Sequence, residues 1–171
     1  GTVSGAGGVR ANNSGWVGEG GTVRALGTGV NGVVSGLAVS GSNVYAGGTF
    51  TTAGGGAANR IAKWNGSAWS AMSSGANAAV QGIVAVGSVV YAVGQFTTAG
   101  VETVNYIGKW NGSAWSALGS GVNGNIQAIA ISGSDVYVAG SFTLAGGVTA
   151  HPVASWDGSA WPDRGSGRNG R

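Results

Sequence analysis

The stretch WNGSAWSAM at residues 64–72 decides the fold, because two closely related stretches follow it in the chain. WNGSAWSAL occupies residues 110–118, and WDGSAWPDR occupies residues 156–164. The copies start 46 residues apart, and no gap is needed to align them. Other aromatic residues and glycines keep the same spacing: Tyr45, Tyr91 and Tyr137; Phe50, Phe96 and Phe142; Gly48, Gly94 and Gly140. The chain is therefore a repeat protein in which each 46-residue unit is one structural module.

The repeat divides the chain into three full units and one partial unit. The full units cover residues 30–75, 76–121 and 122–167, and residues 168–171 form a short tail. Residues 1–29 align with the second half of a unit when they are shifted by one repeat. We interpret them as a decayed partial repeat that supplies a closing strand.

Each unit is predicted to contain four short strands. In the first unit they cover residues 33–39, 43–50, 60–64 and 67–72, which are rich in the Val, Tyr, Trp and Ile that suit strands. A tight turn joins the first pair of strands. The Asn-Gly or Asp-Gly of the repeated stretch is predicted to form a type I′ turn. Such a hairpin would place its two tryptophans diagonally across one face.

The predicted strands are apolar on both faces. In VYAVGQF at residues 90–96, Val90 and Ala92 lie on one side, and Tyr91 and Val93 lie on the other. A sheet with two apolar faces must be covered on both sides. We therefore expect an all-β fold, namely a β-propeller built from four-stranded antiparallel blades with a 46-residue repeat. A β-solenoid is the alternative, although its coils are usually shorter and need no pair of tight hairpins.

The composition excludes several functional classes. The 171 residues include 37 Gly and 7 Trp but no Cys, which rules out disulfides and thiolate metal sites. The net charge is +3 without a clustered basic face, so we expect no nucleic-acid partner. No apolar run approaches the roughly 18 residues of a membrane span, so we expect no membrane insertion. No spacing of histidines or carboxylates indicates a metal, and no cofactor is expected.

Several motifs resemble a known type of repeat. VYVAG at residues 136–140, followed by SWDGSAW, resembles the kelch repeat. ALGSGVNG and AGGTFTTAGG are more similar to Gly-rich, kelch-like β-propeller repeats of secreted bacterial proteins, and to the propeller of fungal cortical polarity-marker proteins. The double glycine of kelch is kept only as Gly47-Gly48. The resemblance implies a propeller, a binding role and an extracellular or cell-surface location, bacterial by preference, and it transfers no catalytic residue. The chain begins Gly-Thr-Val without a signal-like segment, which we interpret as a processed or excised end.

The connection between the second and third strands differs most among the units. It covers residues 54–60, 100–106 and 146–152, and the strand order places it on one rim, opposite the tight turns. A repeated framework with variable loops is how a scaffold separates folding from recognition, although relaxed surface drift is the alternative. The candidate ligand-binding residues are Asn59, Arg60, Glu102, Asn105, Tyr106 and His151.

Three functional hypotheses follow. The favoured one is a non-catalytic module that binds a glycan or a protein. The alternative is a purely structural repeat segment of a larger surface protein or polymer. A hydrolase is the third, and we expect no enzyme because Glu102 and His151 are the only acid–base pair that the variable rim offers.

The end of the third copy departs from the other two. Pro162, Asp163, Arg164 and Arg168 replace Ser116, Ala117, Leu118 and Val122, and neither proline nor charge suits a covered strand. Three units are fewer than the 4–8 blades of a closed propeller. We therefore predict self-association through the ends, with a homodimer favoured and a strand within residues 22–29 completing the third unit. Contact with neighbouring repeats of a longer chain is the alternative.

Overall fold

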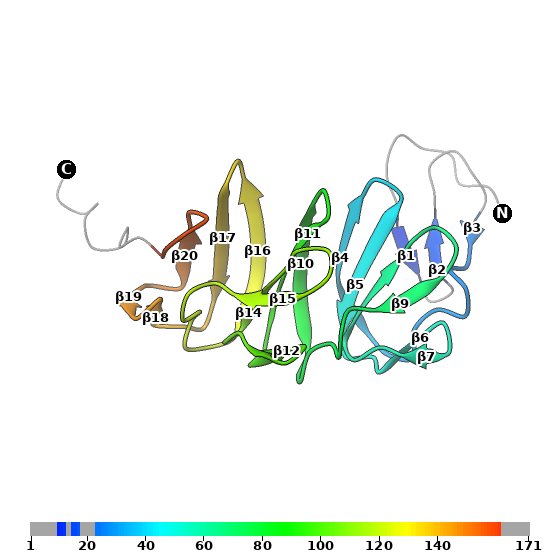
Figure 1. Ribbon diagram of the computed structural model, residues 1–171, viewed down its shortest axis with the longest axis horizontal. Coiled ribbons are helices and arrows are strands. Elements are labelled where there is room, and N and C mark those ends of the chain that lie inside the picture. Colours follow the sequence, from blue (N-terminus) through cyan, green and yellow to red (C-terminus); the bar gives the residue numbers. More distant parts are fainter. Residues whose placement is uncertain (1–9, 13–14, 18–22, 162–171) are drawn as a thin grey trace.

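The computed structural model describes residues 10–12, 15–17 and 23–161, and every regular element in these residues is a β-strand. Figure 1 shows the strands gathered into successive sheets that stand side by side along the longest axis of the molecule. The N-terminal sheet lies at one end and the third unit at the other. The predicted all-β class is therefore confirmed.

Each full unit forms one antiparallel sheet whose strand order follows the sequence. The first sheet contains β4 (Val34–Ser40), β5 (Asn43–Gly48), β8 (Ile61–Trp64) and β9 (Trp69–Ala71). The second contains β10 (Val80–Val86), β11 (Val89–Gly94), β14 (Ile107–Trp110) and β15 (Trp115–Ala117). The third contains β16 (Ile126–Ser132), β17 (Asp135–Gly140) and β20 (Val153–Trp156). Four strands per unit are thus confirmed for the first two units.

The predicted fourth strand of the third unit covers residues 159–164, and only its first part belongs to the described residues. The substituted positions Pro162, Asp163, Arg164 and Arg168 all lie outside them.

The N-terminal sheet has the order β1-β2-β3, with β1 (Arg10–Asn12), β2 (Gly15–Val17) and β3 (Val23–Arg24). When their residue numbers are shifted by one repeat, β2 and β3 align in sequence with β8 and β9, the third and fourth strands of a unit. In this chain β3 pairs with β2. Its pairing with the third unit of another copy stays a prediction.

A small two-stranded hairpin precedes the third strand of every unit, and it was not predicted. The pairs are β6 (Thr52–Ala53) with β7 (Gly56–Ala57), β12 (Thr98–Ala99) with β13 (Glu102–Thr103), and β18 (Leu144–Ala145) with β19 (Val148–Thr149). Strands of two residues are too short to show the alternation from which strands are recognised. The positive φ of Gly54 and Gly55, 60° and 82°, marks the first hairpin's tip.

The turn in the repeated stretch is not the predicted type I′ turn. That turn needs positive φ at both central residues, whereas φ is positive at Gly66 (101°) but not at Asn65. Trp64 pairs with Trp69, so the loop between them has four residues. The Asn65 Oδ1 atom accepts hydrogen bonds from two backbone N–H groups of the loop, each at 2.9 Å. The side chain, rather than a left-handed backbone, therefore closes this turn, and Asp157 does the same in the third unit.

In the first two units the two tryptophans of the hairpin lie directly opposite one another, so the predicted diagonal placement is wrong there. Trp64 and Trp69 are Cα partners with ring centroids 5.5 Å apart. Trp110 and Trp115 have the same arrangement at 5.3 Å. The rings are tilted, which is a favourable geometry for two aromatic side chains.

The second tryptophan of each pair also joins its unit to the preceding one. Its indole N–H donates a hydrogen bond to a backbone carbonyl 43 residues earlier, and we call this bond the tryptophan latch. The three latches are Trp69 to Leu26 at 2.7 Å, Trp115 to Met72 at 2.9 Å and Trp161 to Leu118 at 2.7 Å.

Both faces of the second sheet are covered by its neighbours. Val90 of β11 belongs to a buried cluster that includes Tyr45 of the first sheet. Val93, on the opposite face of β11, belongs to a second cluster with Val136 of the third sheet, and Tyr91 packs against that cluster. The sheets are closest at their first strands, β4, β10 and β16. The prediction that the strands are covered on both faces is confirmed here.

Candidate binding rim

The antiparallel strand order gives the stack of sheets two different rims. We call the end with the connections 41–42, 87–88 and 133–134 the turn rim. The opposite end carries the small hairpins, and we call it the hairpin rim. Figure 1 shows the turns at the top of the view and β6, β7, β12, β18 and β19 at the bottom. This confirms the predicted separation of tight turns from long connections.

An asparagine at the start of each unit positions the small hairpin. The Asn77 Oδ1 atom accepts hydrogen bonds from the backbone N–H groups of Thr97 and Thr98, at 2.9 and 3.1 Å. Its Nδ2 group donates to the Thr97 hydroxyl at 3.0 Å. Asn31 and Asn123 make the same bonds in their units. These asparagines were not predicted from the sequence, although their constant spacing from a threonine 20 residues later was a usable signal.

Two of the predicted site residues use their amide groups to hold the last residues of their own unit, while their backbone carbonyls bond to the next unit. Asn59 donates to the carbonyl oxygen of Ser74 at 3.1 Å, and Asn105 donates to that of Ser120 at 3.0 Å. Their backbone carbonyls accept further bonds from Ala76 and Val122. The third unit has His151 at this position, where it is exposed. The repeated asparagine therefore has a structural task at the hairpin rim.

Arg60 and Tyr106 occupy equivalent positions, and both have a left-handed backbone. Their φ angles are 68° and 75°, which is unusual for residues other than glycine. Arg60 is half-buried and donates from Nη1 to the carbonyl oxygen of Ala76 at 3.0 Å. Tyr106 is also half-buried, and its ring packs against the cluster between the second and third sheets. Neither side chain presents its full surface to a ligand.

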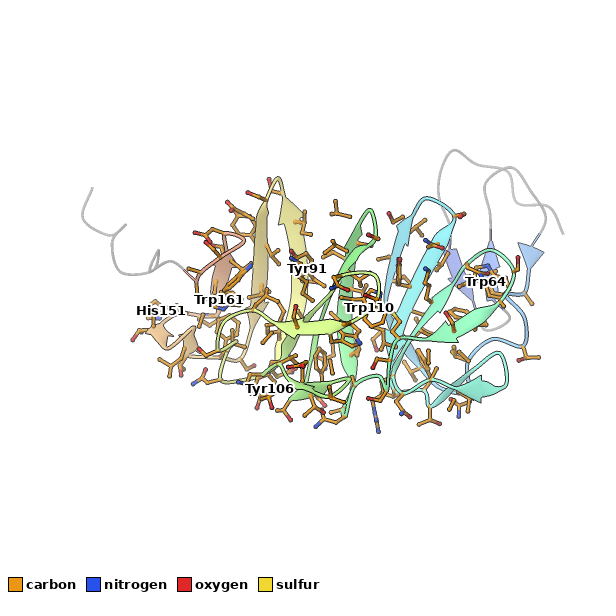
Figure 2. All side chains as sticks on the ribbon, viewed as in Figure 1. Trp64, Tyr91, Tyr106, Trp110, His151 and Trp161 are labelled. Atoms are coloured by element: carbon orange, nitrogen blue, oxygen red, sulfur yellow. The ribbon has the colours of Figure 1, made fainter. Side chains whose placement is uncertain are left out.

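Glu102 and His151 are exposed on the hairpin rim, in β13 and just after β19. No hydrogen bond or ion pair joins them within residues 23–161, so the structure does not bring this pair together. Figure 2 shows His151 near one end of the molecule and Tyr106 near its middle, both on the side of the small hairpins. Among the described residues, no group of three or more acidic or histidine side chains could hold a metal ion.

The hairpin rim also exposes apolar side chains that were not predicted. Val101 at the tip of the second hairpin is 92% exposed, and Leu144 and Val148 of the third hairpin are exposed as well. The first hairpin has Gly55 at the position of Val101. The tips thus differ in chemistry from unit to unit while their supports are the same.

Comparisons with known proteins do not assign the chain to a family. No family model matches it, and no curated protein matches it. Within the part of the chain that the structure describes, no helix has the length and apolar character needed to cross a membrane.

Proposed function

We propose that this chain is a non-catalytic β-propeller repeat module that binds a protein partner through its hairpin rim. The propeller assignment is supported by the four-stranded units, by sheets stacked on both faces and by the close approach of the first strands. Sheets that converge at one strand and stand side by side are the arrangement of propeller blades. The resemblance to kelch-like repeats of secreted proteins supports the same architecture and an extracellular or surface location.

One observation carries the binding role: the exposed tips of the small hairpins differ between units, whereas the residues that hold them repeat. Asn31, Asn77 and Asn123 fix the three hairpins in the same way. Variable side chains on rigid supports suit recognition. Exposed apolar groups such as Val101 and Leu144 favour a protein ligand.

A glycan is the weaker choice of ligand. Sugar recognition uses exposed aromatic faces and unengaged polar groups. Tyr106 is half-buried, and the amides of Asn59 and Asn105 are bonded to the backbone. Asn59, Arg60, Asn105 and Tyr106 therefore fit better as supports of the rim than as its contact groups. Glu102 and His151 are exposed and are the predicted site residues that suit contact with a ligand.

A paired screen tests the proposal. The purified chain is applied to an array of folded extracellular proteins and to a glycan array. For each hit, the affinity is then measured for the wild type, for a Val101→Ser, Leu144→Ser double variant and for Val86→Ser. Val86 is an exposed valine on the turn rim and serves as the matched control. We expect a protein hit whose affinity falls at least tenfold in the double variant and less than twofold in the control.

The second candidate is a purely structural repeat segment. It is favoured by the side chains of Asn59, Arg60 and Asn105, which bond to backbone carbonyls close to the junctions between consecutive units. If neither array gives a hit that depends on Val101 and Leu144, the binding proposal is wrong and the structural role takes its place.

A further inference from the structure

The outer side of the third sheet is left uncovered where the corresponding sides of the first two sheets are buried. Ile61 of the first sheet and Ile107 of the second are both 0% exposed, and each faces the next sheet along the chain. Val153 occupies the same strand position in the third sheet and is 66% exposed. Tyr45 and Tyr137 show the same contrast, with exposed fractions of 1% and 37%. The repeat thus builds this face for burial, and within the described residues no sheet covers it.

We call this surface the end face, and it consists of small and apolar residues. Ser155 replaces Lys63 and Lys109 of the first two sheets, so the third sheet has no lysine at this position. A contiguous apolar face of this kind usually marks an interaction site. Its members are Ala128, Ala130, Tyr137, Ala139 and Val153.

The chain itself shows which surface fits such a face. The end face corresponds to the sides of the first and second sheets that pack on β10 and β16. The residues that cover those sides include Val80 and Ile83, which are buried. Their counterparts one repeat earlier, Val34 and Leu37, lie on the opposite outer side of the first sheet and are only half-buried. The end face and the outward side of the first sheet at β4 therefore carry the two complementary halves of an interface that the chain already forms twice.

We propose that the end face binds the first sheet of a second copy of this chain, head to tail, around β4. This contact continues the stacking of sheets from one copy into the next. It is separate from the hairpin rim, so it does not depend on the rim's binding a ligand. A dimer leaves no end face exposed if two such head-to-tail contacts close it into a ring.

The internal interfaces also give the register of the contact. A Cβ atom built on Gly36 would lie 3.1 Å from the backbone nitrogen of Ile83, and one on Gly82 would lie 3.2 Å from Ile129 Cγ2. Ala128 is the counterpart of Gly36 and Gly82, and Leu37 is the counterpart of Ile83 and Ile129. The same contact between two copies therefore places Ala128 of one copy against Leu37 of the other. The methyl group of Ala128 requires slightly wider spacing than glycine. The second internal interface already accommodates Val93 where the first has Gly47, so the stacking tolerates a larger side chain at such a position.

Sedimentation velocity at micromolar concentrations tests the association. We expect the wild type to sediment as a dimer and Val153→Glu as a monomer, with at least a tenfold weaker association, because the contact would bury an unpaired carboxylate. Val153 is exposed in the single chain, so the substitution should leave its circular dichroism unchanged, and its melting temperature should fall only by what the lost association contributes. Val101→Glu is the matched control on the hairpin rim, and it should remain a dimer. A wild type that is monomeric at these concentrations overturns the proposal.

Disulfide trapping tests the orientation of the two copies. The chain has no native cysteine, so only the introduced thiols can form a disulfide. Ala128→Cys and Leu37→Cys proteins are prepared separately, mixed and oxidised. We expect a disulfide-linked dimer in the mixture and none in either protein alone. A dimer formed by Ala128→Cys alone would show that two end faces pack on each other, which contradicts the head-to-tail contact. Neither outcome bears on a ligand at the hairpin rim, so failure here leaves the proposed function standing.

Discussion

The tryptophan latch of Trp115 should contribute measurably to the stability of the stack. Replacing Trp115 by Phe removes the N–H group that donates to the Met72 carbonyl. That carbonyl keeps a second hydrogen bond, from the Gly75 N–H, so we place the loss near the low end, at about 1 kcal/mol. The smaller ring also leaves a gap against Trp110 and Gly108, which costs about 1–2 kcal/mol more. The total expected loss is about 2–3 kcal/mol in the free energy of unfolding.

The same substitution at Trp69 provides a matched control. Trp69 forms the equivalent latch to Leu26, but its side chain is half-buried, whereas Trp115 is buried. Because a partly exposed ring has fewer contacts to lose, Trp69→Phe should cost only about 1 kcal/mol. Both variants are compared with the wild type by urea unfolding at equilibrium, followed by far-ultraviolet circular dichroism. They must be measured at one protein concentration, because association would raise the apparent stability.

The comparison of the two losses in unfolding free energy tests whether burial makes the latch stabilising. If Trp115→Phe is no more destabilising than Trp69→Phe, the burial of the latch is not what stabilises the contact between units. If Trp115→Phe leaves the unfolding midpoint unchanged, the latch contributes nothing and the sheets are held by apolar packing alone.

Three further predictions concern a turn, a close backbone approach and a titrating side chain. Asn65→Ala should cost about 1 kcal/mol in thermal unfolding because it removes the Oδ1 acceptor, while Asn65→Asp should change little, since Asp157 forms the same turn; equal losses would contradict this. Gly94→Ala should cost about 3 kcal/mol or more, because its Cβ would collide with the Ala79 carbonyl oxygen, against about 1 kcal/mol for Gly87→Ala, where the space is open; chemical denaturation should show the gap. Burial raises the pKa of the Tyr91 hydroxyl above its usual 10.0, so this residue's contribution to stability is fully present below pH 10 and is lost as the pH rises further. Tyr91→Phe should reduce that alkaline loss, and an unchanged pH profile of melting would refute it.

The sequence predicted what the repeat itself determines. The 46-residue spacing and the strand-forming residues located all eight long strands of the first two sheets. The apolar pattern of residues 90–96 indicated correctly that β11 is covered on both faces. These features depend on local preference and on side-chain alternation, and both can be read from a linear pattern.

The sequence failed where one residue type can act in two ways. Asn65-Gly66 is a common type I′ pair, but here the asparagine acts through its side-chain oxygen. Asp157 stands where the other units have Asn. Both residues suit a type I′ turn and both can accept hydrogen bonds through a side-chain oxygen, so this exchange could not distinguish the two kinds of turn. At the rim, Asn59 and Arg60 were predicted to contact a ligand because they are polar and lie in a variable connection. Their side chains bond to the backbone carbonyls of Ser74 and Ala76, at the junction with the next unit, and no linear pattern displays such contacts.

The end face shows a deeper reason for the limits of sequence reasoning in repeat proteins. Ile61, Ile107 and Val153 have the same strand position and similar apolar character, so the sequence gives all three the same orientation. Their burial differs because it depends on whether another sheet follows in space. A repeated sequence specifies an interface at every unit, including the last one, where the chain supplies no further sheet among the residues described. The stacking that folds the interior of such a protein therefore also favours association at its ends. At this face, the exposed side chains of Val153 and Tyr137 favour the proposed contact with a second copy.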